Sequence, residues 1–158
     1  MAARYLTVSW EQFHRDATAL ARQLAVLGSW RGIVAISRGG LVPATIIARA
    51  LNIRIVETVS VVVYDQLSQG CEEALGEPRV TKLPDFAGDG EGFLIIDDLV
   101  DTGTTARVVR AMLPKARFAC VYAKPAGRAL ADDVLLEVSQ DTWIILPWEN
   151  EIAPADIK

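Results

Sequence analysis

The chain has 158 residues, 51% of them hydrophobic, which is enough to bury the core of one globular domain. Its 16 basic and 20 acidic residues give a net charge of −4, which argues against nucleic acid as the main partner. No apolar run reaches the roughly 18 residues that a membrane-spanning helix needs, and the first residues lack the pattern of a signal peptide. Cys71 and Cys120 have no CxxC spacing, so we expect free thiols in a reducing cytoplasm.

The first elements are a short strand over residues 4–8 and an amphipathic helix. Ser9 and Gln12 fit a capping box at the start of this helix, and Gly28 is a typical helix stop. His14 is the single histidine of the chain, so His-based triads and multi-His metal sites are excluded, and we expect it at the surface. The apolar residues at helical spacing, expected in the core, are Trp10, Phe13, Ala17, Leu20, Leu24 and Leu27.

A second strand is predicted over residues 32–36, followed by the loop Ser37-Arg38-Gly39-Gly40 and a helix over 41–51. A strand, a glycine loop and a helix in this order form a typical anion-binding geometry, because glycines let backbone N–H groups approach the ligand. Arg38 could donate two hydrogen bonds to pyrophosphate oxygens. The alternative is a tight turn that needs glycine, with Arg38 merely exposed.

Residues 54–64 are rich in β-branched side chains and predict a long strand. Polar residues, glycine and proline then dominate without periodicity up to the next apolar run. A loop this long in a compact domain is usually functional or disordered, so we expect a flexible lid over about residues 65–92. An insertion without a role is the alternative.

The stretch from Phe93 to Thr105 carries the clearest chemistry. Its first four residues predict a strand buried on both faces, and this strand ends in Asp97 and Asp98, with Asp101 three residues further on. Adjacent carboxylates that point to different sides can hold a vicinal diol or a metal-bound polyol. The T-G-T-T turn then offers backbone N–H groups and hydroxyls where a helix begins, which suits a phosphate. Together they predict a sugar-phosphate site; the alternative is a solvated acidic turn before a plain helix.

The last third of the chain continues the alternation. Strands are predicted over residues 117–123 and 134–138, and Lys124 follows the first of them directly. Trp143 lies beside an apolar run near the end, and the tail from residue 149 is polar. Strands that alternate with helices predict one α/β domain over residues 1–158, with a mostly parallel doubly wound sheet of about five strands and a small hood.

The stretch from Phe93 to Thr105 resembles the ribose-phosphate signature of type I phosphoribosyltransferases, which use 5-phosphoribosyl-1-pyrophosphate (PRPP). The segments Ile36–Pro43, Tyr122–Arg128 and Gln140–Ile144 resemble the bacterial xanthine-guanine members of that family, and the similarity runs from Tyr5 to Trp148. The resemblance implies a purine-salvage enzyme of the cytoplasm. It would transfer the 5-phosphoribosyl group from PRPP to N9 of guanine, xanthine or hypoxanthine, giving the nucleoside 5′-monophosphate and pyrophosphate.

The resemblance also implies a role for individual residues. Asp101 would be catalytic at N7 of the purine, Asp98 would meet Mg²⁺, Lys124 would donate to the 6-oxo group, Trp143 would stack on the ring, and the backbone of Ile144 would contact the 2-position. A strained or cis peptide is expected between Ser37 and Arg38. The residues expected to bind PRPP are Ser37, Arg38, Gly39, Gly40, Arg79, Asp97, Asp98, Thr102, Gly103, Thr104 and Thr105.

Three departures from the family pattern affect the lid and one turn position. Val62 and Val63 stand where the family often has two serines, the lid is longer than usual, and Thr104 replaces a frequent glycine. Arg79 is therefore matched to the phosphate-binding arginine of the lid by position only. The resemblance further implies a dimer or tetramer, with peripheral association of some members with the inner membrane.

Other functions stay open on the sequence alone. A phosphoribosyltransferase that prefers hypoxanthine is one, since the sequence does not rank the three bases. A PRPP-sensing regulator with little catalysis is another, although the net charge of −4 and the lack of Lys/Arg clusters count against nucleic-acid binding. A sugar-phosphate binding protein with an altered lid is the third.

Overall fold

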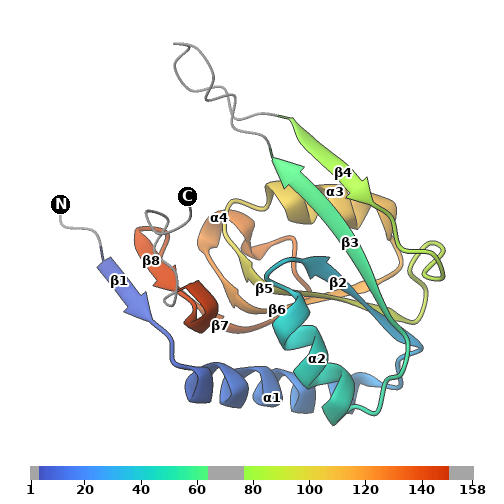
Figure 1. Cartoon of the computed structure of the whole chain (residues 1–158), viewed down its shortest axis with the longest axis horizontal. Helices are drawn as coiled ribbons and strands as arrows, with labels where there is room; N and C mark the ends of the chain where they lie inside the picture. The colour runs from blue at the N-terminus through green and yellow to red at the C-terminus, as the bar shows by residue number, and fades with distance from the viewer. Residues whose placement is uncertain (1–3, 64–76, 150–158) are drawn as a thin grey trace, which may run out of the picture.

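The computed structural model describes residues 4–63 and 77–149, which form an α/β domain with one large sheet and one small one (Figure 1). Among the described helices, none combines the length and hydropathy needed to cross a bilayer. In chain order the elements are β1 (Arg4–Thr7), α1 (Trp10–Leu27), β2 (Gly32–Ser37), α2 (Leu41–Ala50), β3 (Val56–Val63), β4 (Pro78–Lys82), β5 (Phe93–Val100), α3 (Thr104–Met112), β6 (Arg117–Ala123), α4 (Pro125–Arg128), β7 (Asp133–Glu137), β8 (Thr142–Ile145) and the 3₁₀ turn η1 (Pro147–Glu149).

The large sheet has the order β4-β3-β2-β5-β6-β7, with five parallel strands and β4 antiparallel at one edge. The predicted doubly wound, mostly parallel sheet is therefore confirmed. The chain leaves β2 toward β3 on one side and returns to β5 on the other side of β2. Strand order thus reverses between β2 and β5, and in such sheets the crevice at the carboxyl ends of these two strands is where ligands bind.

Alternating apolar residues place a helical layer on each face of the sheet. Ile33 and Ala35 of β2 pack with α1 and α2, whereas Val34 and Ile36 pack with α3. Figure 1 shows α1 and α2 below the sheet and α3 above it. Burial of both faces explains why these strands read as continuous apolar runs rather than as alternating ones.

The hood expected from the sequence is the parallel pair β1–β8, in which Tyr5 lies opposite Trp143 and Leu6 opposite Ile144. It is built from segments at opposite ends of the described chain. The first helix is as predicted: Ser9 Oγ accepts a hydrogen bond from Gln12 N at 3.1 Å, and four of the six expected apolar residues are buried. Trp10 and Leu27, at the two ends of the helix, are half exposed.

Two predicted boundaries differ from the structure. β5 does not end before the acids but continues to Val100, with Asp97 paired opposite Cys120, because the backbone ladder does not depend on side-chain charge. Part of the expected lid is regular: residues 78–82 form β4, which pairs with β3, and Ala87 in the following connection is buried in the core facing α3. The rest of the lid prediction, over residues 64–76, lies outside the described residues, as does Cys71.

Candidate active site

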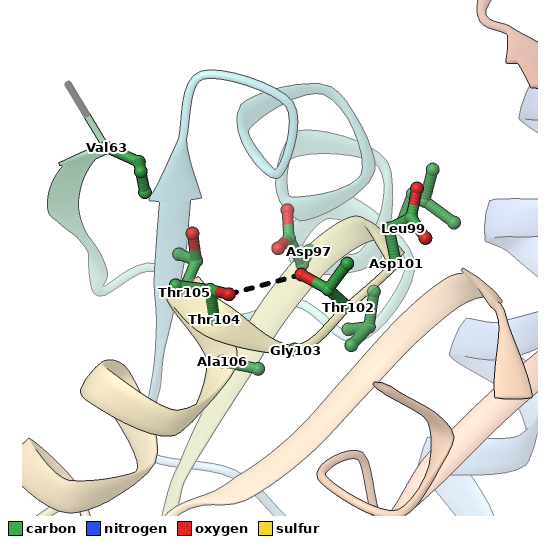
Figure 2. Close-up of a pocket in the computed structure, with 10 residues that line it drawn as sticks. Val63, Asp97, Leu99, Asp101, Thr102, Gly103, Thr104, Thr105 and Ala106 are labelled. Atoms are coloured by element: carbon green, nitrogen blue, oxygen red, sulfur yellow. Dashed lines mark hydrogen bonds between the residues drawn. The ribbon is translucent and has the colours of Figure 1, made fainter. Parts of the chain in front are cut away.

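A cavity of about 290 Å³ opens at the carboxyl end of β5 (Figure 2). The end of β5 and the turn into α3 form most of its wall, and Val63 at the end of β3 closes one side. The strand-order reversal places the loop before α2 next to this cavity. The lining residues are Val63, Asp97, Leu99, Val100, Asp101, Thr102, Gly103, Thr104, Thr105 and Ala106.

The turn from residue 102 to 105 has the geometry of a phosphate site. Gly103 precedes α3 with φ 84°, a left-handed conformation that a residue with a Cβ resists, and a methyl there would lie 2.3 Å from Leu130 Cδ1. Arg107 N donates to Gly103 O, so the amides of residues 104–106 precede the first helical hydrogen bond. The hydroxyls of Thr102 and Thr104 lie 3.2 Å apart, joined by the dashed line in Figure 2. Backbone donors and hydroxyls thus gather at the positive end of a helix dipole.

The second glycine loop lies between β2 and α2. The peptide bond between Ser37 and Arg38 is cis, as expected. Gly40 sits between β2 and β5, where a methyl would lie 2.4 Å from Ile96 O, so only glycine fits without displacing the backbone. Arg38 is exposed, and Ser37 Oγ donates to Val59 O at 3.3 Å.

Asp97 and Asp98 lie on opposite faces of β5. Asp97 lines the cavity before α3 (Figure 2), and the carboxylate of Asp98 packs on the loop before α2, where a methyl on Gly39 would lie 2.2 Å from Asp98 Oδ2. Two short backbone bonds hold these side chains. Asp98 N donates to Asp97 Oδ1 at 3.0 Å, and Leu99 N donates to Asp98 Oδ1 at 2.7 Å. Each carboxylate therefore borders one of the two phosphate-type loops.

Both acids are held where a negative charge is unfavourable. Burial raises the pKa of Asp97 well above its ordinary value, and the neighbouring charge of Asp98 raises it further. Burial also raises the pKa of Asp98, and the carboxylate of Glu149 adds to this. Among the residues that the structure describes, no ion pair reaches either carboxylate. A bound cation would therefore be favoured at this pair.

The chemistry of the pair fits Mg²⁺. Within residues 4–63 and 77–149, no group of three or more acidic, His or Cys side chains is placed to hold a metal. Mg²⁺ usually binds through one or two carboxylates, with waters and substrate phosphates completing its shell, so two carboxylates between two phosphate loops suffice.

Asp101 has a different environment from the acid pair. Its Oδ2 accepts from Lys124 Nζ at 2.8 Å, and its Oδ1 accepts from Gln140 Nε2 at 2.7 Å. The Lys124 side chain is only 7% exposed, which makes it a buried cation whose partner is Asp101. Ala126 N in turn donates to Gln140 Oε1 at 3.0 Å. The prediction placed Asp101 and Lys124 in one site, and the structure brings them into contact.

Sequence reasoning missed Gln140. Its motif Q-D-T-W-I was noticed, but no role was given to the glutamine, because a polar residue in a turn has no periodic signal. Its contact with Asp101 spans 39 positions along the chain.

Several expected site residues do not line this cavity, and three of them, Trp143, Ile144 and Arg79, lie on β8 and β4. Trp143 is 65% exposed on β8, whereas the neighbouring Ile144 is buried. Arg79 is exposed on β4, opposite Val62 and one pair away from Val63, which does line the cavity.

Comparison with known proteins places the chain in a family. Residues 9–155 match the profile described as Phosphoribosyl transferase domain. The chain is 56% identical over 147 residues to the xanthine-guanine phosphoribosyltransferase of Gluconobacter oxydans, covering 92% of this chain and 85% of the relative. It is 53% identical over 148 residues to that of Desulfotalea psychrophila, covering 94% and 88%. The crystal structure of a purine phosphoribosyltransferase from Pyrococcus horikoshii superposes with a TM-score of 0.75 at 27% identity, covering 94% and 96%. The resemblance read from the motifs is thus confirmed, and the chain belongs to the phosphoribosyl transferase family.

Proposed function

We propose that the protein is a purine-salvage enzyme that transfers the 5-phosphoribosyl group of PRPP to N9 of a 6-oxopurine, guanine and xanthine before hypoxanthine. The observation that carries this proposal is the contact of Asp101 with Lys124 at 2.8 Å, next to the cavity bordered by the two phosphate-type loops. An acceptor and a cation side by side complement the edge of a 6-oxopurine that carries N7–H and O6. The relatives that are named xanthine-guanine phosphoribosyltransferases support the same reaction.

At the ribose end, the two loops would hold the two phosphate-bearing ends of PRPP. The amides and hydroxyls of residues 102–105 take the 5′-phosphate, and residues 37–40, with the exposed Arg38, take the pyrophosphate. Asp97 and Asp98, on opposite faces of β5, hold the two ribose hydroxyls between these loops. Arg79 on β4 is assigned to the pyrophosphate as well.

Asp98, with Asp97 beside it, would hold Mg²⁺. When bound, the ion neutralises charge on the pyrophosphate as it departs. The acid pair supplies the carboxylate oxygens that this ion prefers. A bound cation would offset the cost of holding these two carboxylates in charged form in a buried position.

At the base end, Lys124 uses one of its three donors on Asp101 and has two more for O6. N9 of the base forms a bond to C1 of the ribose while the bond from C1 to the pyrophosphate oxygen breaks with its electron pair leaving on pyrophosphate. The proton on N7 passes to the Asp101 carboxylate. Adenine carries an amino donor in place of O6, so the Lys124 ammonium would disfavour it. Trp143 stacks on the ring, and the backbone of Ile144 contacts the 2-position.

The test is formation of nucleoside monophosphate from PRPP and Mg²⁺ with guanine, xanthine, hypoxanthine and adenine, beside the variant Asp101→Ala. We expect turnover of the 6-oxopurines and not of adenine, and a loss of about 10²- to 10⁴-fold in the variant, the usual contribution of a positioned acid or base. No turnover of any base, with PRPP still bound, would favour the PRPP-sensing regulator instead.

We also propose that the enzyme works in the cytoplasm as a homodimer or homotetramer, as the resemblance implies. Size-exclusion chromatography with light scattering checks the assembly, because a monomer at micromolar concentration contradicts it. Peripheral membrane association, which rests on family resemblance alone, is checked by sedimentation with vesicles of anionic lipid.

A further inference from the structure

Gln140 makes two hydrogen bonds through its side-chain amide, and together they permit only one orientation of that amide. Ala126 N can only donate, so it faces the amide oxygen at 3.0 Å, and the Asp101 carboxylate faces the amide nitrogen at 2.7 Å. A flipped amide would bring two donors together at one end and two acceptors at the other. The direction of both bonds is therefore fixed by the partners.

The turn that carries Gln140 is itself tied down. Thr142 N donates to Ser139 O at 3.0 Å, and the hydroxyls of the same two residues lie 2.7 Å apart. The turn leads directly into β8, which carries Trp143. Gln140 thus links the hood strand to the loop after β5.

Together, Gln140 and Lys124 hold Asp101 from both sides. Each carboxylate oxygen has one donor, Lys124 Nζ on Oδ2 and Gln140 Nε2 on Oδ1. Both donors are anchored in one short segment, since Lys124 belongs to it and Gln140 is bonded to Ala126 within it. With one donor on each oxygen, the plane of the carboxylate is set even though its side chain is 45% exposed.

We propose that Gln140 is a positioning residue for this reaction. It holds the Asp101 carboxylate in the orientation that meets N7 of the base, and it fixes the position of that carboxylate relative to β8, the strand that carries Trp143. The inference rests on the proposed function, in which Asp101 takes the proton from N7. Gln140 touches no substrate in this role and acts through Asp101.

Two substitutions separate this role from simple support of the turn. Gln140→Glu keeps the size and the acceptor toward Ala126 N but puts a carboxylate oxygen where Asp101 Oδ1 needs a donor. Gln140→Met keeps the length and loses both bonds. Asp141→Asn is the matched control, because it lies in the same turn and its own ion pair, with Arg4 at 3.9 Å, is exposed at the surface.

The measurement is kcat and both KM values with guanine and PRPP, together with thermal unfolding of each variant. We expect kcat to fall about 10- to 100-fold in both Gln140→Glu and Gln140→Met, as small misplacements of a reacting group do, with KM for PRPP within about twofold of the wild type. Asp141→Asn should keep the wild-type kcat, and all variants should unfold within a few degrees of it.

Each contrary result has a distinct meaning. Wild-type kcat in Gln140→Glu with a loss in Gln140→Met would reduce Gln140 to support of the turn through Ala126 and overturn the inference. A loss of PRPP affinity equal to the loss of kcat would overturn it as well. An inactive wild type, or an Asp101→Ala variant as active as the wild type, would remove the proposed function on which it rests.

Discussion

Asp97 and Asp101 are four residues apart in the chain, yet their carboxylates have opposite environments at the proposed ribose end and the proposed base end of the site. At the base end, Asp101 has a buried lysine on one oxygen and an amide donor on the other, both supplied by the chain. At the ribose end, Asp97 and Asp98 have backbone donors but no cation among the described side chains, and burial raises the pKa of both.

The difference lies in charge compensation. The chain itself supplies the partners of Asp101, whereas the charges of Asp97 and Asp98 would be compensated only when ligands bind. The proposed acceptor, a neutral base, brings no charge, so the base end has to contain its own charge balance. The proposed ligands of the ribose end, PRPP and Mg²⁺, would bring both signs of charge, so this end can leave its acids uncompensated. Charge that the fold does not balance is available to select a charged ligand.

The largest effect should follow from removing the buried cation at the base end of the site, Lys124. Lys124→Met removes the proposed donor for O6 and the cation that faces Asp101, so kcat/KM for guanine should fall about 10²- to 10³-fold, the usual cost of losing one aimed donor. Steady-state kinetics with guanine and PRPP measure it.

Lys115→Met is the control for this prediction, because Lys115 pairs with Asp89 at 2.7 Å with its side chain 58% exposed. A drop in kcat/KM of similar size in the control, or no drop in Lys124→Met, would mean that the buried cation does not contribute specifically to binding or reaction of the base.

A smaller effect is expected where the ribose end is packed. In Gly39→Ala the new methyl would lie 2.2 Å from Asp98 Oδ2, so this carboxylate has to turn away from the loop. We expect KM for PRPP to rise about tenfold, an overpacking cost of about 1–3 kcal/mol, with KM for guanine unchanged. If KM for guanine rises as much as KM for PRPP, the two ends are not independent.

The smallest effect should be a gain in stability from neutralising the uncompensated end. Asp97→Asn keeps the shape and the acceptor for Asp98 N but removes a buried charge. At about pH 8 the free energy of unfolding should therefore rise by about 1 kcal/mol, a common gain for one stabilising substitution, and Tm by about 2–4 °C.

The pH dependence gives this prediction its sign. The folded protein has a raised pKa at Asp97, so it binds more protons than the unfolded chain from the ordinary value of 3.8 upward. Wild-type stability from this group is therefore fully present below that value and is lost as pH rises through the folded pKa. The advantage of Asp97→Asn should shrink toward acid pH; an advantage that is constant with pH would mean that charge is not its cause.

The sequence predicts the ribose end better than the base end for a physical reason. Both phosphate-type loops are local: strand, glycine turn and helix start follow one another within about a dozen residues, and the glycines at 40 and 103 mark them. The sheet follows from the same alternation of apolar runs. The contact of Gln140 with Asp101 joins segments 39 positions apart, and no local pattern encodes it.

Two further errors come from the same limit. The acidic residues suggested that the strand beginning at Phe93 ends before Asp97, but hydrogen-bonded pairing with β6 extends the strand by four residues, to Val100. The residues of β4 were predicted to belong to the lid, because they are mostly polar. They form a strand because they pair with β3, and this pairing is not encoded in their own sequence. Which carboxylate faces which loop then depends on the register of β5, and therefore on the fold.

The parallel pair of β1 and β8 has a consequence for the order in which the protein can assemble. Arg4 pairs opposite Thr142, so β1 can pair only after β8 has been synthesised, near the end of the described chain. The two glycine loops and β5 are synthesised long before that moment. A nascent chain released before residue 142 would carry both phosphate loops without the strand that bears Trp143, so the base end is the last part of the site to form.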